Sequence, residues 1–433
     1  MWFEFISRTL LALRARSFDV IIFYHTFFVC SIKERGMGMK SFVNVTDQID
    51  DLPLAVTELL AGTSSEVLGK NTVGILLCYS DMDTTELVSA LAQKASFPIL
   101  GCTTIATMEG KGGFHDLAVT LTVLSSDDCS FALGVSDPIT PQNVAEQIDK
   151  TCRSVCQELG EEPQLLYVLP PYILDIMLDE YAIGFNRCCP NVPLLGGLPS
   201  YNAIGDKNLT VFGGEDFPDR MVLLAVGGNL RPVFTVQNVT AVDADRKRKV
   251  TESKDNVIYR VGDQTFTDYL REVGLPVESL TQGNATITFV SNPLLLESSQ
   301  DDFSFVRTLH EINLEEGSGT AIAQIPVGAT MSICSLQRSE IEQAAAAGVK
   351  ALKEKMAAAQ SDGYQYSTVL AVSCIGRHLL MSPNNDAEVN SLLNEFPADL
   401  ALSGFYSYGE LGPQGATRTQ NFAHNESLIL CAF

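Results

Sequence analysis

Three segments of the sequence repeat the same order of hydrophobic runs and helical patterns, and this repeat limits the fold more than any other feature. Each segment alternates apolar runs typical of buried strands with amphipathic helical patterns, and each ends in a loop and a last apolar run. Strands that alternate with helices indicate layers in which helices shield a sheet. We therefore predict an α/β fold of repeated β-α-β-α-β-β units, which form mixed sheets flanked by helices.

The repeat also predicts where the domains begin and end. Residues 40–230 contain the first two units, and residues 329–433 contain the third, whose opening strand is predicted over 329–335. The last strand of each unit is expected to run antiparallel beside its parent sheet. In each unit the third strand ends in a short junction that starts with a glycine, namely Gly101, Gly197 and Gly404.

Residues 231–328 interrupt the repeat. They contain short runs of β-branched and aromatic residues that are typical of strands, among them residues 285–291, and one short helical pattern at 266–274. This part is interpreted as a small, mostly-β insert that starts the C-terminal part of the protein.

The first 39 residues differ in character from the rest. Three arginines precede an apolar run at 20–32, which is too short for a helix that spans a bilayer. Two interpretations fit: residues 1–36 contain an organelle-targeting segment, or translation starts at Met37 or Met39. Residues 1–39 are therefore interpreted as an N-terminal extension, and a cytoplasmic location is expected for the rest.

The net charge indicates which partners are excluded, and the cysteines indicate the redox state of the compartment. A formal net charge of −23 argues against nucleic acids and anionic membranes, which are themselves polyanionic. The eleven cysteines have no regular spacing, which favours reduced thiols of a cytosolic-type compartment over a disulfide framework. Cys152 and Cys156 are spaced like half of a metal site. No Cys/His pair follows at zinc spacing, so packing in the core is the preferred interpretation.

The densest group of polar residues follows the predicted strands of the third unit. Residues 403–426 are rich in glycine and are expected to form a loop at the end of a sheet. Since α/β proteins bind ligands at one end of the sheet, polar side chains that follow neighbouring strands are expected to converge there. The predicted ligand-binding residues are Cys374, Arg377, Gly404, Tyr406, Tyr408, Glu410, His424 and Asn425.

Arg377 and Glu410 indicate the class of ligand. A guanidinium group holds a carboxylate through two hydrogen bonds, and a carboxylate accepts hydrogen bonds from an ammonium group, so the two suit an amino-acid-like ligand. The alternative is an internal ion pair between Arg377 and Glu410 that braces the loop, with His424 capping it. The two interpretations do not exclude each other.

Catalysis and cofactor chemistry find less support. A cysteine nucleophile would pair Cys374 with His424 or His378, but Cys374 ends an apolar strand, which favours an inert thiol. No nucleophile elbow or phosphate-binding glycine motif stands at a strand-to-helix junction, so no enzymatic activity is expected. Haem is the one cofactor considered, and its candidate axial ligands are Cys189 of a Cys-Pro dipeptide, His115, His310, His378 and His424.

Several motifs are similar to those of a known family. The N-terminal half carries FPILGCTTIATM, VPLLGGLPSYN and NVIYRVGDQTFTDYLREVGL, and the C-terminal half carries VLAVSCIGRHLLM, LALSGFYSYGELGP and FAHNESLIL. Over residues 42–433 these motifs resemble the N- and C-terminal parts of the FIST family, a sensory domain named for F-box and intracellular signal transduction proteins. Residues 1–40 contain no recognisable F-box pattern.

The resemblance implies a sensory module that binds a small molecule, with amino acids among the proposed ligands. Some bacterial relatives are linked to haem and nitric oxide sensing, so a haem-based gas sensor is one alternative. Some eukaryotic relatives carry an F-box that recruits a ubiquitin ligase, so a protein-interaction adaptor is another. The expected partners are a small-molecule ligand and a protein that receives the signal, with no nucleic acid and no membrane.

Overall fold

The structure is a computed structural model. It describes residues 39–201, 207–238, 246–281, 284–298, 303–359, 363–397, 400–413 and 420–433. The N-terminal extension predicted for residues 1–39 lies outside the described residues except for Met39, which is buried.

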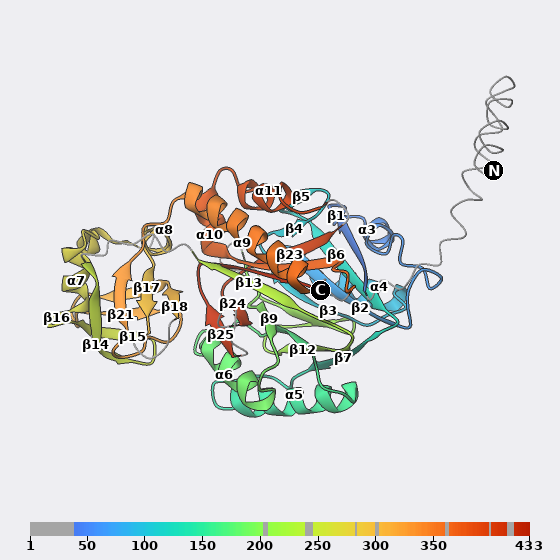
Figure 1. The fold of residues 1–433 in the computed structure, drawn as a ribbon, viewed down its shortest axis with the longest axis horizontal. Helices are drawn as coiled ribbons and strands as arrows, with labels where there is room; N and C mark the ends of the chain where they lie inside the picture. The colour runs from blue at the N-terminus through green and yellow to red at the C-terminus, as the bar shows by residue number, and fades with distance from the viewer. Residues whose placement is uncertain are drawn as a thin grey trace, which may run out of the picture. The chain divides into compact units, whose positions relative to one another are not determined.

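Three six-stranded sheets with the same internal order form the main body of the protein (Figure 1). In each sheet four neighbouring strands come from one unit, and the middle two strands of the whole sheet are a parallel pair. The remaining two strands are a short antiparallel hairpin that another unit supplies. The predicted α/β fold of repeated units with mixed sheets is therefore confirmed.

The strands of each sheet follow one another in space in equivalent orders. The first sheet contains, in that order, β1 (Lys40–Thr46), β6 (Val119–Ser126), β2 (Asn71–Tyr79), β3 (Ile99–Thr104), β10 (Thr210–Phe212) and β11 (Glu215–Phe217). The second contains β7 (Cys129–Val135), β12 (Val222–Gly228), β8 (Leu165–Leu169), β9 (Leu194–Gly197), β24 (Glu410–Pro413) and β25 (Asn421–His424). The third contains β13 (Val233–Asn238), β26 (Ser427–Ala432), β22 (Thr368–Cys374), β23 (Ala401–Ser407), β4 (Thr107–Glu109) and β5 (Gly113–His115).

The hairpins are exchanged around a ring of units. Unit two supplies β10–β11 to the sheet of unit one, unit three supplies β24–β25 to unit two, and unit one supplies β4–β5 to unit three. The loop predicted over 403–426 is therefore wrong in part, because this segment contains β23 and the hairpin β24–β25. The open edge of β9 supplies the backbone partners of β24, and the local sequence does not reveal that edge.

Strand order within the units follows the prediction with one exception. The last strands β6, β12 and β26 run antiparallel beside β2, β8 and β22, as expected. The prediction that unit three opens at 329–335 is wrong, because β21 (Thr330–Ile333) pairs with strands of the insert. The opening strand is instead β13, which pairs with β26. The insert thus lies inside unit three, between its first strand and its first helix.

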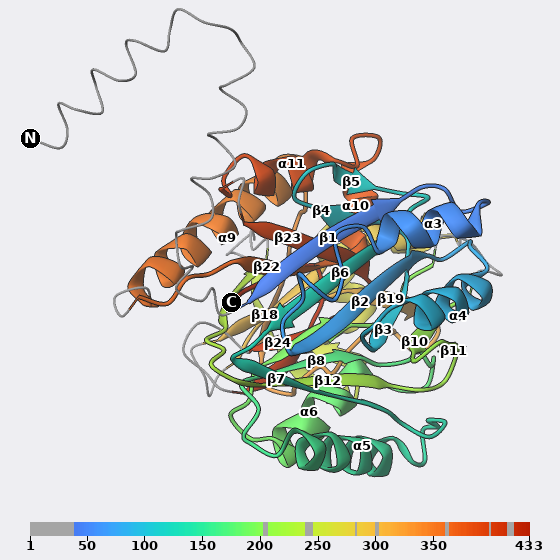
Figure 2. The ribbon, with the colours of Figure 1, turned by 90° about the vertical axis from the view of Figure 1, so that its right-hand side faces the viewer.

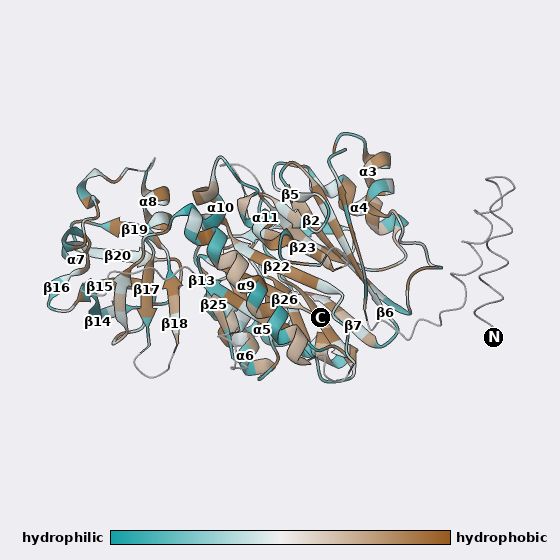
Figure 3. Cartoon of the chain, turned by 45° about the horizontal axis from the view of Figure 1, so that its top comes forward, coloured by the Kyte–Doolittle hydropathy of each residue, from teal (hydrophilic) through white to brown (hydrophobic). Residues whose placement is uncertain are grey.

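Helices cover the outer faces of the sheets (Figure 2). The longest, α9 (Arg338–Ala359), buries one stripe of small and apolar residues against unit three and exposes its polar side chains. In Figure 3 α9 carries both hydrophilic and hydrophobic residues, whereas the strands β22, β23 and β26 are largely hydrophobic. The other helices of the units are α3 (Leu52–Leu59), α4 (Thr84–Lys94), α5 (Val144–Leu159), α6 (Leu178–Cys188), α10 (Ile375–Met381) and α11 (Ala387–Leu393).

The insert has its own sheet and its own hydrophobic core. Residues 285–291, predicted as a strand, form helix α8 (Ala285–Ser291), in which Phe289 and Val290 are buried. Here tertiary packing overrides the strand preference of threonine, isoleucine and valine. The other elements are β14 (Arg248–Lys254), β15 (Val257–Val261), β16 (Gln264–Thr265), α7 (Phe266–Glu272), the 3-10 helix Val277–Ser279, β17 (Leu294–Glu297), β18 (Ser304–Arg307), β19 (Leu309–Asn313), β20 (Ser318–Ala321) and β21.

One glycine in each parallel pair allows the strands to approach closely. A Cβ atom at Gly101 would lie 1.8 Å from the carbonyl oxygen of Leu76, and a Cβ atom at Gly404 would lie 2.4 Å from that of Ala371. In unit two Gly196 holds this position, one residue before the predicted Gly197. Gly404 was predicted to bind a ligand. In the structure it lies inside β23 and allows close packing of the parallel strands.

Candidate functional site

The predicted ligand-binding residues lie around the carboxyl ends of β22 and β23, but they separate into several groups. Arg377 lies on α10 behind the sheet and pairs with α11. Cys374 and Glu410 lie together with Glu426, a residue that the sequence pattern did not single out. Tyr406 lies in β23 and Tyr408 follows its end, and the two rings join different aromatic groups.

Arg377 forms an internal ion pair, but its partner is not Glu410. Its Nε donates to Glu388 Oε1 at 2.7 Å and its Nη2 donates to the same oxygen at 2.5 Å. Ser373 donates to the other oxygen of Glu388 at 2.7 Å. Both charged side chains are completely buried. The predicted pairing of Arg377 with Glu410 is therefore wrong. The ion pair joins α10 to α11 and does not brace the loop.

Glu410 and Glu426 form a buried pair of carboxyl groups. Glu410 Oε2 accepts hydrogen bonds from the Ser427 hydroxyl at 2.7 Å and from its backbone N–H at 3.2 Å. Glu426 Oε1 accepts from the hydroxyl of Thr308, a residue of the insert, at 2.9 Å. Burial raises the pKa of Glu410 to about 8 and the pKa of Glu426 to about 7, although the hydrogen bonds from Ser427 and Thr308 act in the opposite direction. Both groups therefore hold their protons in the fold at pH values where a solvated glutamate is ionised.

This pair of carboxyl groups should make the protein less stable as the pH rises. Because the folded pKa of Glu410 lies above the value of 4.5 expected in the unfolded chain, the folded state binds the proton more tightly. The free energy of unfolding should therefore fall between pH 6.5 and 8, by at most about 1.4 kcal/mol per pH unit for each carboxyl group. Denaturant unfolding at a series of pH values measures this slope.

The window starts at pH 6.5 because His424 acts in the opposite direction below it. Burial lowers the pKa of His424 to about 4, so this residue adds stability as the pH rises towards 6.5 and nothing more above. Glu410→Gln should flatten the slope above pH 6.5, whereas Glu311→Gln, at an exposed position of β19, should keep it. An unchanged slope in Glu410→Gln would contradict the assignment.

His424 and Asn425 lie at the end of the exchanged hairpin. His424 Nε2 lies 3.2 Å from the carbonyl oxygen of Pro413, and the amide of Asn425 donates to the carbonyl oxygen of His424 at 2.9 Å. The ring of Phe422 packs edge-on against the His424 ring, with their centroids 5.4 Å apart. His424 thus lies opposite Glu410 in the β24–β25 pair, with its ring against Phe422.

The two tyrosines have separate surroundings. The Tyr406 ring lies 5.0 Å from the ring of His378, which in turn stacks on Phe114. Tyr408 donates its hydroxyl to the carbonyl oxygen of Tyr201 at 3.0 Å and packs against the rings of Tyr172 and Tyr201. The structure therefore does not bring Tyr406, Tyr408 and Glu410 together around one ligand.

Cys374 has the surroundings of an inert thiol. It is buried, and burial together with the carboxyl groups of Glu410 and Glu426 raises its pKa well above the usual range. A thiol that keeps its proton is a poor nucleophile, as expected from its place at the end of an apolar strand.

Polar atoms without hydrogen-bond partners concentrate in this region. Buried polar atoms nearly always have a partner, so a group of exceptions indicates a place for water or a ligand. Among the residues that the structure describes, five such atoms belong to predicted site residues or to the neighbouring Glu426: Arg377 Nη1, Glu410 Oε1, His424 Nδ1, Asn425 Oδ1 and Glu426 Oε2.

A cavity of about 420 Å³ lies where the insert meets units two and three. Its lining combines three phenyl rings with charged and polar groups from unit two and the insert. Asp179 comes from α6 and Phe422 comes from β25. The insert supplies Asp255, Ser298, Phe303, Phe305, Arg307, Gln324, Ile325 and Pro326.

Arg307 is the central side chain of this cavity. It is almost fully buried, and its guanidinium group lies 4.6 Å from the ring centre of Phe305 and 4.8 Å from that of Phe422. Nη2 pairs with Asp179 at 3.3 Å. Nε donates to the carbonyl oxygen of Gln324, and Nη1 donates to those of Val306 and Ala423. Arg307 thus ties the insert to α6 of unit two and to β25 of unit three.

Sequence patterns did not predict this cavity, although one signal was present. Arg307 is the single charged residue in the apolar run FSFVRTL, and a charge in a buried strand requires a partner. The partner, Asp179, lies 128 residues away and in another unit. No local pattern predicts such a pairing.

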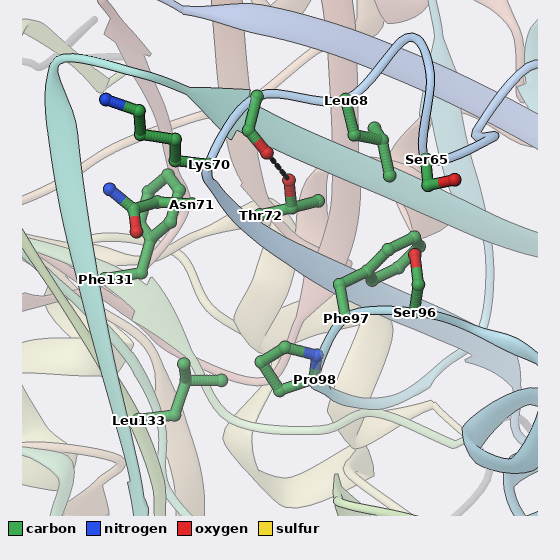
Figure 4. Close-up of a pocket in the computed structure, with 11 residues that line it drawn as sticks. Ser65, Leu68, Lys70, Asn71, Thr72, Ser96, Phe97, Pro98, Phe131 and Leu133 are labelled. Atoms are coloured by element: carbon green, nitrogen blue, oxygen red, sulfur yellow. Dashed lines mark hydrogen bonds between the residues drawn. The ribbon is translucent and has the colours of Figure 1, made fainter.

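A second cavity, of about 410 Å³, lies between β7 and the segments that lead into β2 and β3. Figure 4 shows its apolar side chains, Phe97, Phe131 and Leu133, with Lys70 and Asn71 at one side. Its polar members have ordinary partners: Thr72 bonds Ser125, and Asn71 donates to the carbonyl oxygen of Cys129. This cavity therefore offers fewer polar groups that could bind a ligand than the cavity around Arg307.

Two family descriptions match the chain in adjoining segments. The FIST N domain matches residues 72–264, and the FIST C domain matches residues 265–413. The border between the two matches lies inside the insert, at the start of α7. A comparison with curated proteins finds no match.

Solved structures give a distant likeness. A crystal structure of cyanuric acid hydrolase from A. caulinodans covers 91% of this chain and 98% of its own, with 9% sequence identity and a TM-score of 0.37. A likeness at this level carries no functional information. Among the described residues, none of the helices is both long and apolar enough to cross a membrane.

Proposed function

The chain belongs to the FIST family, whose domains are sensory domains of signal transduction, and from this premise we propose that it senses an amino-acid-like molecule in the cavity around Arg307. The observation that carries the proposal is this cavity, where a buried guanidinium group, two carboxylates and three phenyl rings face one space. Its volume of about 420 Å³ falls in the range of sites for small molecules.

The charges of the cavity suit a zwitterion. Asp255 is exposed and offers a carboxylate to an ammonium group, which the neighbouring phenyl rings also favour. The Arg307 side chain has five N–H groups, and four of them have partners among the described residues. The fifth remains for a carboxylate of the ligand. An apolar ligand side chain would lie against the rings of Phe303 and Phe422.

The predicted site residues have a supporting place in this proposal. Arg307 lines the cavity, and the next residue, Thr308, donates a hydrogen bond to Glu426 in the buried carboxyl pair. A ligand that moves Arg307 would therefore disturb Glu426, Glu410 and Cys374 behind it, and would shift the insert relative to β25. We propose that this change is what a protein partner reads.

A thermal-shift screen with the common amino acids tests the proposal. A ligand present at about 100 times its Kd should stabilise the protein by about 2.7 kcal/mol, which raises the melting temperature by several degrees. Asp255→Asn should abolish the shift, because it removes the carboxylate while asparagine tolerates the left-handed backbone found there.

Asp263→Asn is the matched control for this screen. Asp263 lies exposed in the same module but outside the cavity, so this variant should respond to the ligand like the wild type. A screen in which no amino acid shifts the melting temperature would contradict the ligand class. A shift that survives in Asp255→Asn would contradict the site.

A further inference from the structure

Four cysteines meet between α5 and α6, outside the cavity around Arg307. Cys189 Sγ lies 3.1 Å from Cys152 Sγ and 3.4 Å from Cys156 Sγ. The sulfur atoms of Cys152, Cys188 and Cys189 all lie within 4.8 Å of one another. We propose that these four cysteines bind a thiophilic d¹⁰ metal ion, Zn²⁺ in the first instance.

Local structure explains how the four thiols come together. Cys152 and Cys156 lie one turn apart on the same side of α5, which faces α6. On a continuous helix Cys188 and Cys189 would point about 100° apart. The helix ends at Cys188, and the backbone of Cys189 leaves the helical conformation before Pro190. This break directs both sulfur atoms of the adjacent pair towards α5.

The distances suit a metal better than a disulfide. A disulfide requires about 2.05 Å between two sulfur atoms. Four thiolates around zinc at about 2.3 Å lie about 3.8 Å apart in a tetrahedron. The 3.1 Å from Cys189 to Cys152 and the 3.4 Å from Cys189 to Cys156 each need a small expansion to reach that spacing. A disulfide would also use only two of the four thiols, whereas Cys189 is close to three others.

Burial and charge also fit a bound ion. Cys152 and Cys189 are buried at 1% and 7% exposure, while Cys156 and Cys188 are half-buried, so the cluster has a core side and a side that an ion can reach. The neighbouring cation Arg187 is neutralised by Asp149 at 2.7 Å and leaves no strong repulsion for a metal ion. Binding exchanges the thiol protons for Zn²⁺, so affinity should rise with pH.

The sequence pattern alone did not reveal this site. Cys152 and Cys156 were interpreted as core packing because no second pair follows at the usual spacing. The second pair comes 32 and 33 residues after Cys156 as adjacent residues, and only the packing of α6 on α5 places it there. A metal ion at this site would hold α5 and α6, which cover the sheet of unit two, together.

Cobalt substitution tests the site on the full chain. After reduction and removal of metal with a chelator, Co²⁺ should bind with one equivalent per chain and produce the near-ultraviolet charge-transfer absorption of cobalt–thiolate bonds. Zn²⁺ should displace it. Cys189→Ser should weaken binding by at least about 100-fold, since loss of a ligand costs more than loss of the groups that support it. Cys156→Ser, at a half-buried position that tolerates a hydroxyl group, should also weaken it.

Cys129→Ser is the matched control, because Cys129 is a buried thiol of the same unit that lies outside the cluster. It should bind cobalt like the wild type. Three outcomes would overturn the proposal: no charge-transfer absorption in the reduced wild-type protein, an absorption that Cys189→Ser leaves intact, or a Cys152–Cys189 disulfide found by mass spectrometry in protein purified under reducing conditions.

Discussion

Replacing Arg377 by methionine is expected to lower the free energy of unfolding by about 3–5 kcal/mol, because it leaves the carboxylate of Glu388 buried without a counter-charge. Both side chains have no exposed surface, and the pair joins α10 to α11 at the end of β22. Methionine fills most of the space of the arginine side chain, so the loss reports the charge rather than a cavity. Denaturant unfolding at neutral pH measures the change.

A double variant distinguishes the loss of the ion pair from a general destabilisation by the substitution. Arg377→Met combined with Glu388→Gln removes both charges and keeps an amide that can accept from Ser373. We expect the double variant to recover half or more of the loss, because neutral partners avoid the cost of a lone buried charge. The exposed Lys353→Ala, which removes a partner of Glu395 on the surface, should change stability by at most about 1 kcal/mol. A double variant no better than Arg377→Met would contradict the explanation.

Replacing Asp179 by alanine is expected to loosen the insert from the rest of the protein. Without Asp179, Arg307 keeps its charge in a buried position, and the backbone N–H of Gln324 loses its acceptor. Breaking a buried pair in this way typically costs about 3–5 kcal/mol. Because Arg307 holds the insert to β25, the cost should appear as local opening. Hydrogen exchange should accelerate in β18 and β20 before the central strands of the three sheets are affected.

An ion pair inside the insert provides the control for this prediction. Arg271 pairs with Glu278 at the surface of the same module, and Arg271→Ala should leave the exchange pattern unchanged. Asp179→Asn, which retains the shape and one acceptor oxygen, should fall between Asp179→Ala and the wild type. Acceleration spread evenly over all three sheets after Asp179→Ala would show that Arg307 does not act as a clamp for the insert.

Sequence patterns predicted the local layout of the fold well. The helical pattern at 266–274 became α7, and the apolar run at 329–335 became the strand β21, because burial and helical periodicity are local properties. The exchange of hairpins was not predictable in the same way. The strand β24 reads ELGP and pairs with β9, more than 200 residues away, so its structure comes from a distant sheet edge. The insert inside unit three separated β13 from α9 and led to the wrong opening strand.

Side-chain contacts in the candidate site were also hard to predict where they join distant parts of the chain. Residue types and strand ends placed Glu410, His424 and Asn425 in one buried layer, but the partner of Arg377 came from α11 rather than from the adjacent loop. Glu426, next to two predicted residues, gained its importance only when Thr308 of the insert reached it. Ion pairs and shared carboxyl groups depend on contacts between units, and the spacing within one unit does not determine those contacts.

The ring of exchanged hairpins has a consequence for how the chain can be divided. A fragment that ends at residue 264, where the two family matches meet, would carry β4–β5 without the edge of β23 that it pairs with, and would leave the edge of β9 bare. Bare edges and detached hairpins are sites of aggregation. The two named domains are therefore halves of one cooperative assembly, which closes only after the last strands have been synthesised, and expression of either half alone should give insoluble or partly folded protein.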